Sequence, residues 1–148
     1  MAEPTVWTFF YGSFINLDVL KQAGYVPERF EVARLSGFDI RIQPLANLFR
    51  SDRHCVYGIV CQATHGELRG LYGQDWLGGT YLPEAVLVEA EGGRLLPALC
   101  YIAPTRPPAP PAGDDLDWIT DAAREYGFPG WYVERLESFR GRTVEGPG

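Results

Sequence analysis

The pattern of apolar and polar positions predicts a chain that is rich in strands and ends in helices. Runs of β-favouring residues, some alternating and some continuous, predict strands over residues 6–11, 30–36, 37–42, 55–62, 81–91 and 95–102. Residues 55–62 are apolar almost throughout, as is typical of a strand buried on both faces. Gly92-Gly93 predicts a hairpin turn between the last two strands. Residues 44–53 show no clear pattern, and we assign them to a loop.

Helical signals occur after the first strand, in the middle of the chain and in its last third. Asn16 is a suitable N-cap for a short helix, and residues 67–71 predict one or two helical turns. Asp114 or Asp115 is expected to cap a longer helix, and Pro129 begins another. The sequence therefore predicts an α+β fold, whose mostly antiparallel sheet has enough strands to curl into a β-barrel.

Length and composition favour a single folded domain. The chain has 148 residues, of which 46% are hydrophobic and 14% aromatic, enough to form a substantial core. We expect the domain to cover residues 1–140, with residues 141–148 as a flexible tail because they are rich in Gly and charge. The proline-rich residues 104–113 are expected to cross the domain as an extended segment, since too little chain follows for a second domain.

The charge distribution argues against nucleic acid and membranes as partners. The formal net charge is −6, and the 13 basic residues are scattered rather than clustered. No apolar run approaches the length of a membrane span, and the first residues do not resemble a signal peptide, so we expect a cytoplasmic protein. Three cysteines in strand-like surroundings are typical of reduced thiols, and His54 and His65 match no zinc-binding spacing. We therefore predict no metal site.

Residues 8–16 give the first candidate site. The first strand ends abruptly at Gly12-Ser13, and Asn16 then opens a helix. Such a junction exposes backbone N–H groups beside the positive end of a helix, where an anion can be held without a basic side chain. Because most Gly-Ser loops only connect elements, this interpretation depends on what the rest of the chain brings to the loop.

Four segments, in this order along the chain, resemble the γ-glutamylcyclotransferase-like family. They are Phe10-Tyr11-Gly12-Ser13, the strand Val56-Tyr57-Gly58-Ile59-Val60, residues 68–81, and residues 122–136. Family members read Tyr-Gly-Ser-Asn or a close variant at the first segment and have the same Gly in the second. At the third they read Leu-x-x-Leu-Asp-x-x-Glu-Gly, followed by a Tyr on the next strand. The fourth resembles the closing helices of the γ-glutamylcyclotransferase branch, so the resemblance covers nearly the whole chain.

This resemblance implies a fold and a reaction. The fold is a small, mostly antiparallel β-barrel flanked by helices, with a cavity at its mouth. In the reaction, the α-amine of a γ-glutamyl group attacks its own γ-amide carbonyl, forms 5-oxoproline and releases an amine or amino acid. Since nucleophile and electrophile are tethered, the enzyme orients the substrate, moves a proton with one carboxylate and stabilises an oxyanion. The implied partner is a small γ-glutamyl compound, and no metal or cofactor is required.

Matching the chain to the family pattern residue by residue implies a set of site residues. Asp75 falls at the position of the catalytic acid. The implied substrate-binding residues are Tyr11, Gly12, Ser13, Phe14, Tyr81 and Tyr132. The sequence departs from the pattern at the acid, which is Asp rather than Glu, and at Trp76, which replaces the following Gly. Glu67 and Glu84 are rival carboxylates, which we assign to the first turn of a helix and to an exposed strand edge.

Two other functions stay open at this point. A catalytically impaired family member would serve as a small-molecule binding or interaction protein, and a related cyclotransferase would act on γ-glutamyl amines. Few basic residues lie near the motifs, so the sequence gives no support for a large anionic substrate such as glutathione. Either a monomer or a homodimer is compatible with the sequence.

Overall fold

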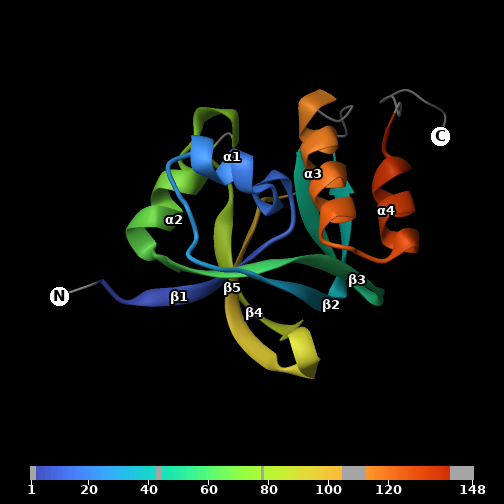
Figure 1. Ribbon diagram of the computed structural model, residues 1–148, viewed down its shortest axis with the longest axis horizontal. Helices are drawn as coiled ribbons and strands as arrows, with labels where there is room; N and C mark the ends of the chain where they lie inside the picture. The colour runs from blue at the N-terminus through green and yellow to red at the C-terminus, as the bar shows by residue number, and fades with distance from the viewer. Residues whose placement is uncertain (1–2, 43–44, 78, 105–112, 141–148) are drawn as a thin grey trace.

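Five strands and four α-helices form the part of the chain that the computed structural model describes, residues 3–42, 45–77, 79–104 and 113–140 (Figure 1). The strands are β1 (Thr5–Phe10), β2 (Glu31–Ile42), β3 (Ala46–Thr64), β4 (Leu82–Ala90) and β5 (Leu95–Ile102). The α-helices are α1 (Leu17–Gln22), α2 (His65–Tyr72), α3 (Gly113–Glu125) and α4 (Gly130–Glu137). Three short 3₁₀ turns are η1 (Ser13–Ile15), η2 (Asp75–Leu77) and η3 (Glu91–Gly93). Most of the predicted proline-rich segment and the predicted tail lie outside the described residues.

The five strands form one mixed sheet that closes on itself. The hydrogen-bonded order is β1-β3-β2-β4-β5, and β1 also pairs with β5. The β1–β5 pairing is parallel, whereas the other four neighbouring pairs are antiparallel. A closed ring of five strands cannot alternate in direction at every position, so one parallel pair is unavoidable. The α+β class is confirmed, and the sheet is mixed rather than antiparallel throughout.

Strand β2 joins two segments that the sequence pattern separates. Residues 30–36 and 37–42 were predicted as two strands, but they lie in one strand with a register shift between Ser36 and Phe38. Gly37, between them, has φ +89°, a backbone conformation that other residues rarely adopt. The irregularity lets one strand bend instead of ending, which the local pattern does not reveal.

The first part of β3 corrects the prediction of a loop over residues 44–53. Strand β3 begins at Ala46, and its first residues pair with the end of β2, from Ile42 opposite Ala46 onward. Ala46 and Leu48 are buried, whereas residues 52–54 are exposed. The strand signal is weak here because only a few inward positions carry apolar side chains, while cross-strand pairing with β2 supplies the rest of the stabilisation.

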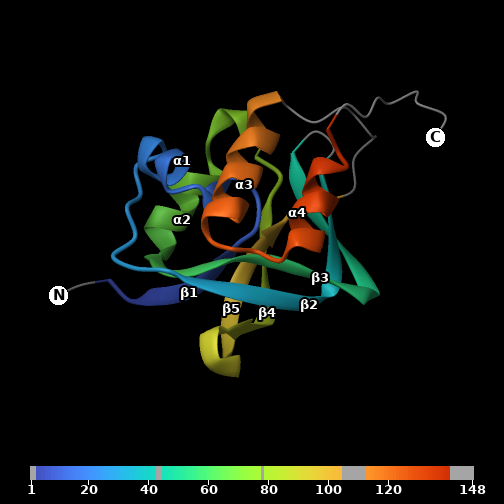
Figure 2. The same cartoon turned by 45° about the vertical axis from the view of Figure 1, so that its right-hand side comes forward.

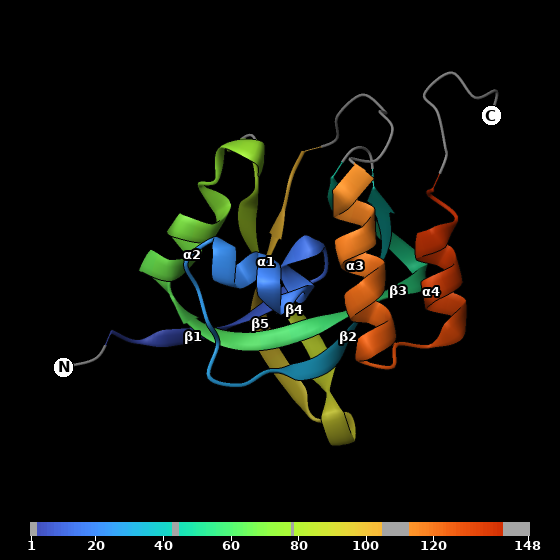
Figure 3. The same cartoon turned by 45° about the horizontal axis from the view of Figure 1, so that its top comes forward.

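The four α-helices gather on one side of the closed sheet, and the β4–β5 hairpin extends to the opposite side (Figures 1 and 2). Helix α1 lies beside α2, and α3 lies beside α4 (Figure 3). Asn16 caps α1 as predicted, since its side chain accepts a hydrogen bond from the Asp18 N–H at 3.0 Å. The hairpin predicted at Gly92-Gly93 is also confirmed. No helix in the described segments is long and apolar enough to cross a membrane.

Aromatic and aliphatic side chains fill the space between the sheet and these helices. Phe9 and Phe10 of β1 are fully buried, as are Ile15 and Leu20 in the segment that follows. The Phe10 ring meets the Phe14 ring edge to face, with the centroids 5.8 Å apart. Each fully buried side chain of this size contributes about 1.5–3 kcal/mol to folding. The core therefore fixes the end of β1 and the turn that leaves it.

Gly58 of β3 is required by the close approach of β1. A Cβ at this position would lie 2.0 Å from the Phe10 carbonyl oxygen and 2.9 Å from the Phe9 ring. We expect Gly58→Ala to lower the free energy of unfolding by about 3 kcal/mol, because backbone must move to admit the methyl group. Urea denaturation would measure the change.

Gly70→Ala is the matched control, since nothing lies within 4 Å of a Cβ at that position in α2. We expect the free energy of unfolding of this variant to rise by roughly 0.5–1 kcal/mol, because Ala favours the helix more than Gly does. Equal stability of Gly58→Ala and the unmodified protein would show that β1 and β3 do not approach as closely as described.

Candidate functional site

A cavity opens where the end of β1, the turns η1 and η2, helix α2 and the first turn of α3 meet. The space in it that is open to a water molecule is about 30 Å³, and all the empty space out to its open mouth is about 330 Å³. The lining residues come from segments far apart in the sequence: Tyr11, Gly12, Ser13, Phe14, Leu45, Ala46, Tyr72, Trp76, Leu77, Tyr81 and Asp115. Five of the six predicted substrate-binding residues are therefore brought together, namely Tyr11, Gly12, Ser13, Phe14 and Tyr81.

The loop after β1 forms one wall of this cavity with its backbone. A Cβ on Gly12 would lie 2.9 Å from the Ala46 Cβ, so a glycine allows the loop to pass this close to β3. The carbonyls of Gly12 and Ser13 accept from Ile15 and Asn16 at 3.0 and 2.9 Å. Within the described segments, the N–H groups of Gly12, Ser13 and Phe14 donate to no backbone carbonyl. These N–H groups are thus suited to bind an oxygen atom of a ligand.

Tyrosines form much of the remaining wall, and their hydroxyl groups are engaged. The Tyr11 hydroxyl donates to the Tyr101 carbonyl at 2.6 Å, and that of Tyr81 donates to the Ala46 carbonyl at 2.5 Å. The Tyr72 ring stacks on the Tyr101 ring at 4.0 Å. Burial raises the pKa of Tyr11 well above its usual value, so this phenol stays neutral. The tyrosines therefore shape the cavity, and they are not suited to transfer a proton.

Asp75, the acid that the family resemblance implies, is the first residue of η2 and its side chain is exposed. It does not line the cavity, although its neighbours Trp76 and Leu77 do. The Trp76 ring meets the Phe14 ring edge to face, with the centroids 5.8 Å apart. The structure thus places Asp75 at the outer rim of the site.

Tyr132 lies apart from the cavity, on the buried face of α4. Its side chain is 1% exposed and packs against the rings of Tyr57, Phe128 and Trp131. The structure therefore does not bring Tyr132 together with the other predicted substrate-binding residues.

Asp115 is the carboxylate that lines the cavity, and the sequence reasoning did not select it. Its side chain is 3% exposed, and its Oδ2 has no hydrogen-bond partner. Burial raises the pKa of Asp115 to about 6, while hydrogen bonding with the Ser13 side chain acts in the opposite direction. A buried carboxylate oxygen without a hydrogen-bond partner is rare in proteins and often marks a functional site.

The sequence contained a signal for this residue. Asp114 and Asp115 were predicted as alternative N-caps, but α3 begins at Gly113, so both lie in its first turn. Asp115 precedes the buried Ile119 by four residues and the buried Ala123 by eight, which places it on the apolar face of the helix. An acidic residue at a core position of an amphipathic helix is the pattern that identifies it.

Two hydrogen bonds hold α3 against the loop after β1. The Asn16 side-chain amide donates to the Trp118 carbonyl at 3.1 Å, and the Tyr126 hydroxyl donates to the Ile15 carbonyl at 2.7 Å. Their partners on the loop, Ile15 and Asn16, are neighbours, whereas Trp118 and Tyr126 are eight residues apart, so α3 is joined to the loop at two points. Asp115 is thereby held beside this loop, where its carboxyl group hydrogen-bonds with the Ser13 side chain, and both residues line the cavity.

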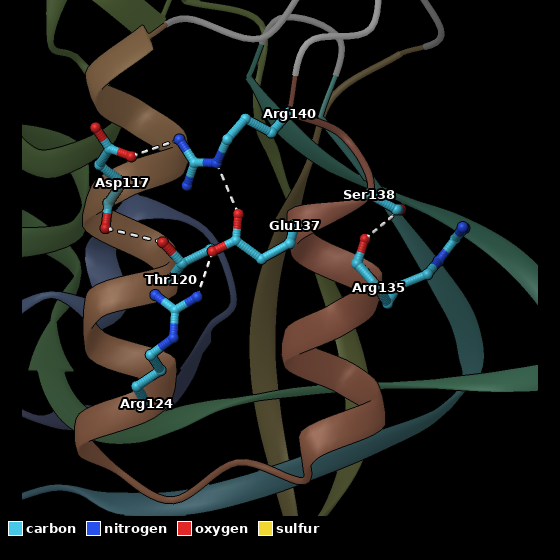
Figure 4. Close-up of polar contacts among 7 residues, drawn as sticks. All are labelled: Asp117, Thr120, Arg124, Arg135, Glu137, Ser138 and Arg140. Carbon is cyan, nitrogen blue, oxygen red and sulfur yellow. Dashed lines mark hydrogen bonds and ion pairs between the residues drawn. The ribbon is translucent and has the colours of Figure 1, made fainter.

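Helix α4 supports α3 from the other side through a chain of ion pairs (Figure 4). Arg140 contacts Asp117 of α3 through Nη1 and Glu137 of α4 through Nε, each at 2.7 Å. Arg124 pairs with the same Glu137. Because these groups are largely exposed, each pair adds little stability, and their main effect is to orient the two helices.

The rival carboxylates have other partners. Glu67 forms a capping box with Thr64 at the start of α2, and Glu84 forms an ion pair with Arg50. The expected roles of both residues in the local structure thus agree with their contacts. In the described residues, no cluster of three His, Cys, Asp or Glu side chains is arranged to hold a metal ion.

A second hollow lies between the start of β1 and the segment that follows α1. Trp7, Tyr25 and Arg29 are among the residues that line it, together with Gln62 and Glu67. It contains none of the predicted site residues, and its Glu67 already serves as a helix cap. The cavity beside Asp115 is therefore the better candidate for a functional site.

Comparison with known proteins relates the fold, but not the sequence, to an enzyme class. No protein-family model and no curated protein matches the chain. A solved γ-glutamyl cyclotransferase has a TM-score of 0.75 at 23% identity, over 95% of this chain and 94% of its own. An uncharacterized protein from Homo sapiens has a TM-score of 0.77 at 24% identity, over 92% and 88%. A yeast γ-glutamyl cyclotransferase specific for glutathione has a TM-score of 0.66 at 13% identity, over 93% of this chain and 96% of its own.

These matches confirm the resemblance at the level of the fold. The chain adopts the α+β fold of the γ-glutamyl cyclotransferases over nearly its whole length. At such low identity, a shared fold does not show which residues of this chain are catalytic.

The buried carboxylate of Asp115 should make the protein less stable above pH 6. Its pKa is about 6 in the folded protein and 3.8 when unperturbed, so the folded state binds the proton more tightly. The associated stability is fully present below pH 3.8 and is lost as the pH rises through 6. We expect Asp115→Asn to raise the free energy of unfolding at pH 7.5 by about 1–3 kcal/mol, and by almost nothing at pH 4.

Urea denaturation at a series of pH values would measure this difference. Asp114→Asn is the matched control, because it removes the same charge from an exposed position in the same turn. An increase in the free energy of unfolding that is the same at pH 4 and pH 7.5, or the same in both variants, would contradict a raised pKa at Asp115.

Proposed function

We propose that this protein is a γ-glutamyl cyclotransferase, which releases 5-oxoproline and an amine from a γ-glutamyl amide. The observation that carries the proposal is the cavity itself, which brings the backbone amides of the loop after β1 together with one buried carboxylate. This arrangement occurs in a fold shared with solved γ-glutamyl cyclotransferases. It contains the donors and the proton carrier that an intramolecular cyclisation needs.

The loop amides fit the anionic groups of such a substrate. In the proposed complex, the N–H groups of Gly12, Ser13 and Phe14, which donate to no backbone carbonyl within the described segments, bind the α-carboxylate or the oxyanion that develops on the γ-carbonyl. The rigid tyrosine wall favours the folded conformer in which the α-nitrogen approaches the γ-carbon. Because the two reacting groups belong to one molecule, holding this conformer accounts for a large part of the rate.

The proton carrier of the reaction has two candidates. Asp75 is the acid that the family resemblance implies, and its exposed position requires η2 to move inward before it reaches a substrate. Asp115 already lies in the cavity wall. The proposal as a cyclotransferase holds with either residue, and the two are separated by experiment.

A non-catalytic binding protein is the second candidate function. The exposed position of Asp75 favours it, since a relative without a working acid would retain the cavity and still bind a γ-glutamyl compound. The two functions differ in one observable, which is the release of 5-oxoproline.

The protein should release 5-oxoproline when it is incubated with a panel of γ-glutamyl amides and dipeptides. Chromatography would measure this release. Gly12→Val is the variant that disables the site, because even a Cβ at this position meets the Ala46 side chain at 2.9 Å. We expect it to lower kcat/KM by about a hundredfold through displacement of the loop. Gly70→Ala, in open space on α2, is the control that should retain activity.

No release from any compound, combined with thermal stabilisation by one of them, would favour the binding protein instead. Asp75→Asn belongs in the same assay, since a loss of turnover there would support the acid that the resemblance implies.

The charge of the cavity predicts which leaving groups are accepted. Among the described lining residues there is no Lys or Arg, and Asp115 contributes a negative charge. A second carboxylate on the leaving group would lie within several ångströms of Asp115, at a cost of about 1–2 kcal/mol for a pair near the surface. We expect γ-glutamylethylamide to have a kcat/KM roughly tenfold above that of γ-glutamylglycine, which differs mainly by its carboxylate.

Steady-state kinetics at low and at high salt would test this preference, since the difference should shrink as screening increases. A preference for γ-glutamylglycine would show that a cation reaches the leaving group.

A further inference from the structure

We infer that Asp115 is the residue that accepts and returns the proton in the reaction, in place of the acid at position 75. This inference rests on the proposed cyclotransferase function and assigns its central role. It differs from the residue that the family resemblance implies, because Asp115 lies on α3 and Asp75 on η2.

Position is the first argument. Asp115 is the one carboxylate among the described residues that line the cavity, and the loop from Tyr11 to Phe14 lines the same space. Four buried side-chain atoms in the described residues have no hydrogen-bond partner, on Thr8, Asp115, Tyr132 and Arg135. Of these, only the Asp115 oxygen belongs to a cavity-lining residue. A substrate ammonium group would supply the partner that this oxygen lacks.

Rigidity is the second argument. The bonds from Asn16 to Trp118 and from Tyr126 to Ile15 hold α3 against the loop at one point within the helix and at one just after its end. A carboxylate on a packed helix is placed more precisely than one on an exposed turn. Asp75, in contrast, is exposed and does not line the cavity.

The charge of the group suits the task. Tyr11, Tyr72 and Tyr81 face the cavity from β1, α2 and the segment before β4, and burial raises the pKa of the first two well above the usual value. The Ser13 side chain hydrogen-bonds with the carboxyl group and lowers its pKa, but by less than burial raises it. No cation is among the described residues that line the cavity. With its pKa raised to about 6, Asp115 is ionised at neutral pH and is a stronger base than an exposed aspartate.

The proton inventory of the reaction closes with this one group. The Asp115 carboxylate takes a proton from the substrate α-ammonium, and the freed nitrogen lone pair forms a bond to the γ-carbonyl carbon. The bond from that carbon to the departing nitrogen then breaks, as the departing nitrogen receives the proton back from Asp115. The ring nitrogen, left with one proton too many, gives it to the same carboxylate, which passes it to the released amine. Of the three ammonium protons, one stays on the lactam nitrogen and two leave with the amine, which departs as an ammonium ion. No oxidant, metal or covalent enzyme intermediate takes part.

The test compares Asp115→Asn, Asp115→Glu, Asp75→Asn and Asp114→Asn with γ-glutamylethylamide as the probe. We expect Asp115→Asn to lower kcat by a hundredfold or more, with a smaller change in KM. Asp115→Glu should restore a measurable part of the rate, because it returns a carboxylate to the cavity. Asp114→Asn, exposed in the same helical turn, should keep the rate of the unmodified protein. Circular dichroism and urea denaturation would confirm that each variant is folded.

The pH profile separates a proton carrier from a merely structural residue. In the unmodified protein kcat/KM should fall tenfold per pH unit below about 6, and this limb should be absent from the residual activity of Asp115→Asn. Full activity of a folded Asp115→Asn, or a loss confined to Asp75→Asn, would overturn the assignment while leaving the cyclotransferase function intact. Absence of 5-oxoproline release by the unmodified protein would instead remove the proposed function, and this inference with it.

Discussion

Strand β1 is hydrogen-bonded on both edges, to β3 and to β5, and most of the structure depends on this. Because the sheet has five strands, the pairing that closes it must be parallel, and β1 and β5 therefore end at the same side. The chain leaving β1 enters the space beneath the helices, where Phe10 and Phe14 anchor it in the core. The close fit of Gly58 against this strand allows the two backbones to approach. Closure of the sheet thus sets the position of the loop that forms the cavity wall.

Helix α3 completes the site at a cost to stability. Its apolar face packs on η1, yet the first turn of that face carries Asp115, whose burial disfavours the ionised form. The bonds of Asn16 and Tyr126 across this contact, and the ion pairs from α4, hold the helix in place despite the unpaired charge. A group kept in an unfavourable environment by its surroundings is available to a ligand that neutralises it. This physical conflict is the strongest argument that the cavity has a chemical role.

The family resemblance and the cavity both include the loop after β1, but they differ on the acid. The resemblance implies Asp75, a residue of the exposed turn η2, whereas the cavity contains the carboxylate of a different helix. A tethered reaction tolerates such a change, since the proton carrier has only to reach the α-nitrogen and the departing nitrogen from one side. The loop amides meet a stricter requirement, because they must face the developing negative charge at fixed distances. In the proposed reaction, the loop therefore supplies the fixed donors, while the carboxylate depends on which side chain reaches the cavity.

The sequence by itself determined the local elements whose signal lies in neighbouring residues. The Asn16 cap, the Gly92-Gly93 hairpin and the strand-rich first part all follow from turn chemistry and short-range periodicity. Tertiary structure decided what depends on distant partners, including the long β2–β3 pairing, the parallel closing pair and the lining of the cavity. Whether an aspartate faces solvent or a cavity depends on which helix packs over which loop, and local sequence does not record that contact. The family resemblance therefore implies Asp75, whereas the tertiary structure brings Asp115 into the cavity wall and leaves Asp75 exposed.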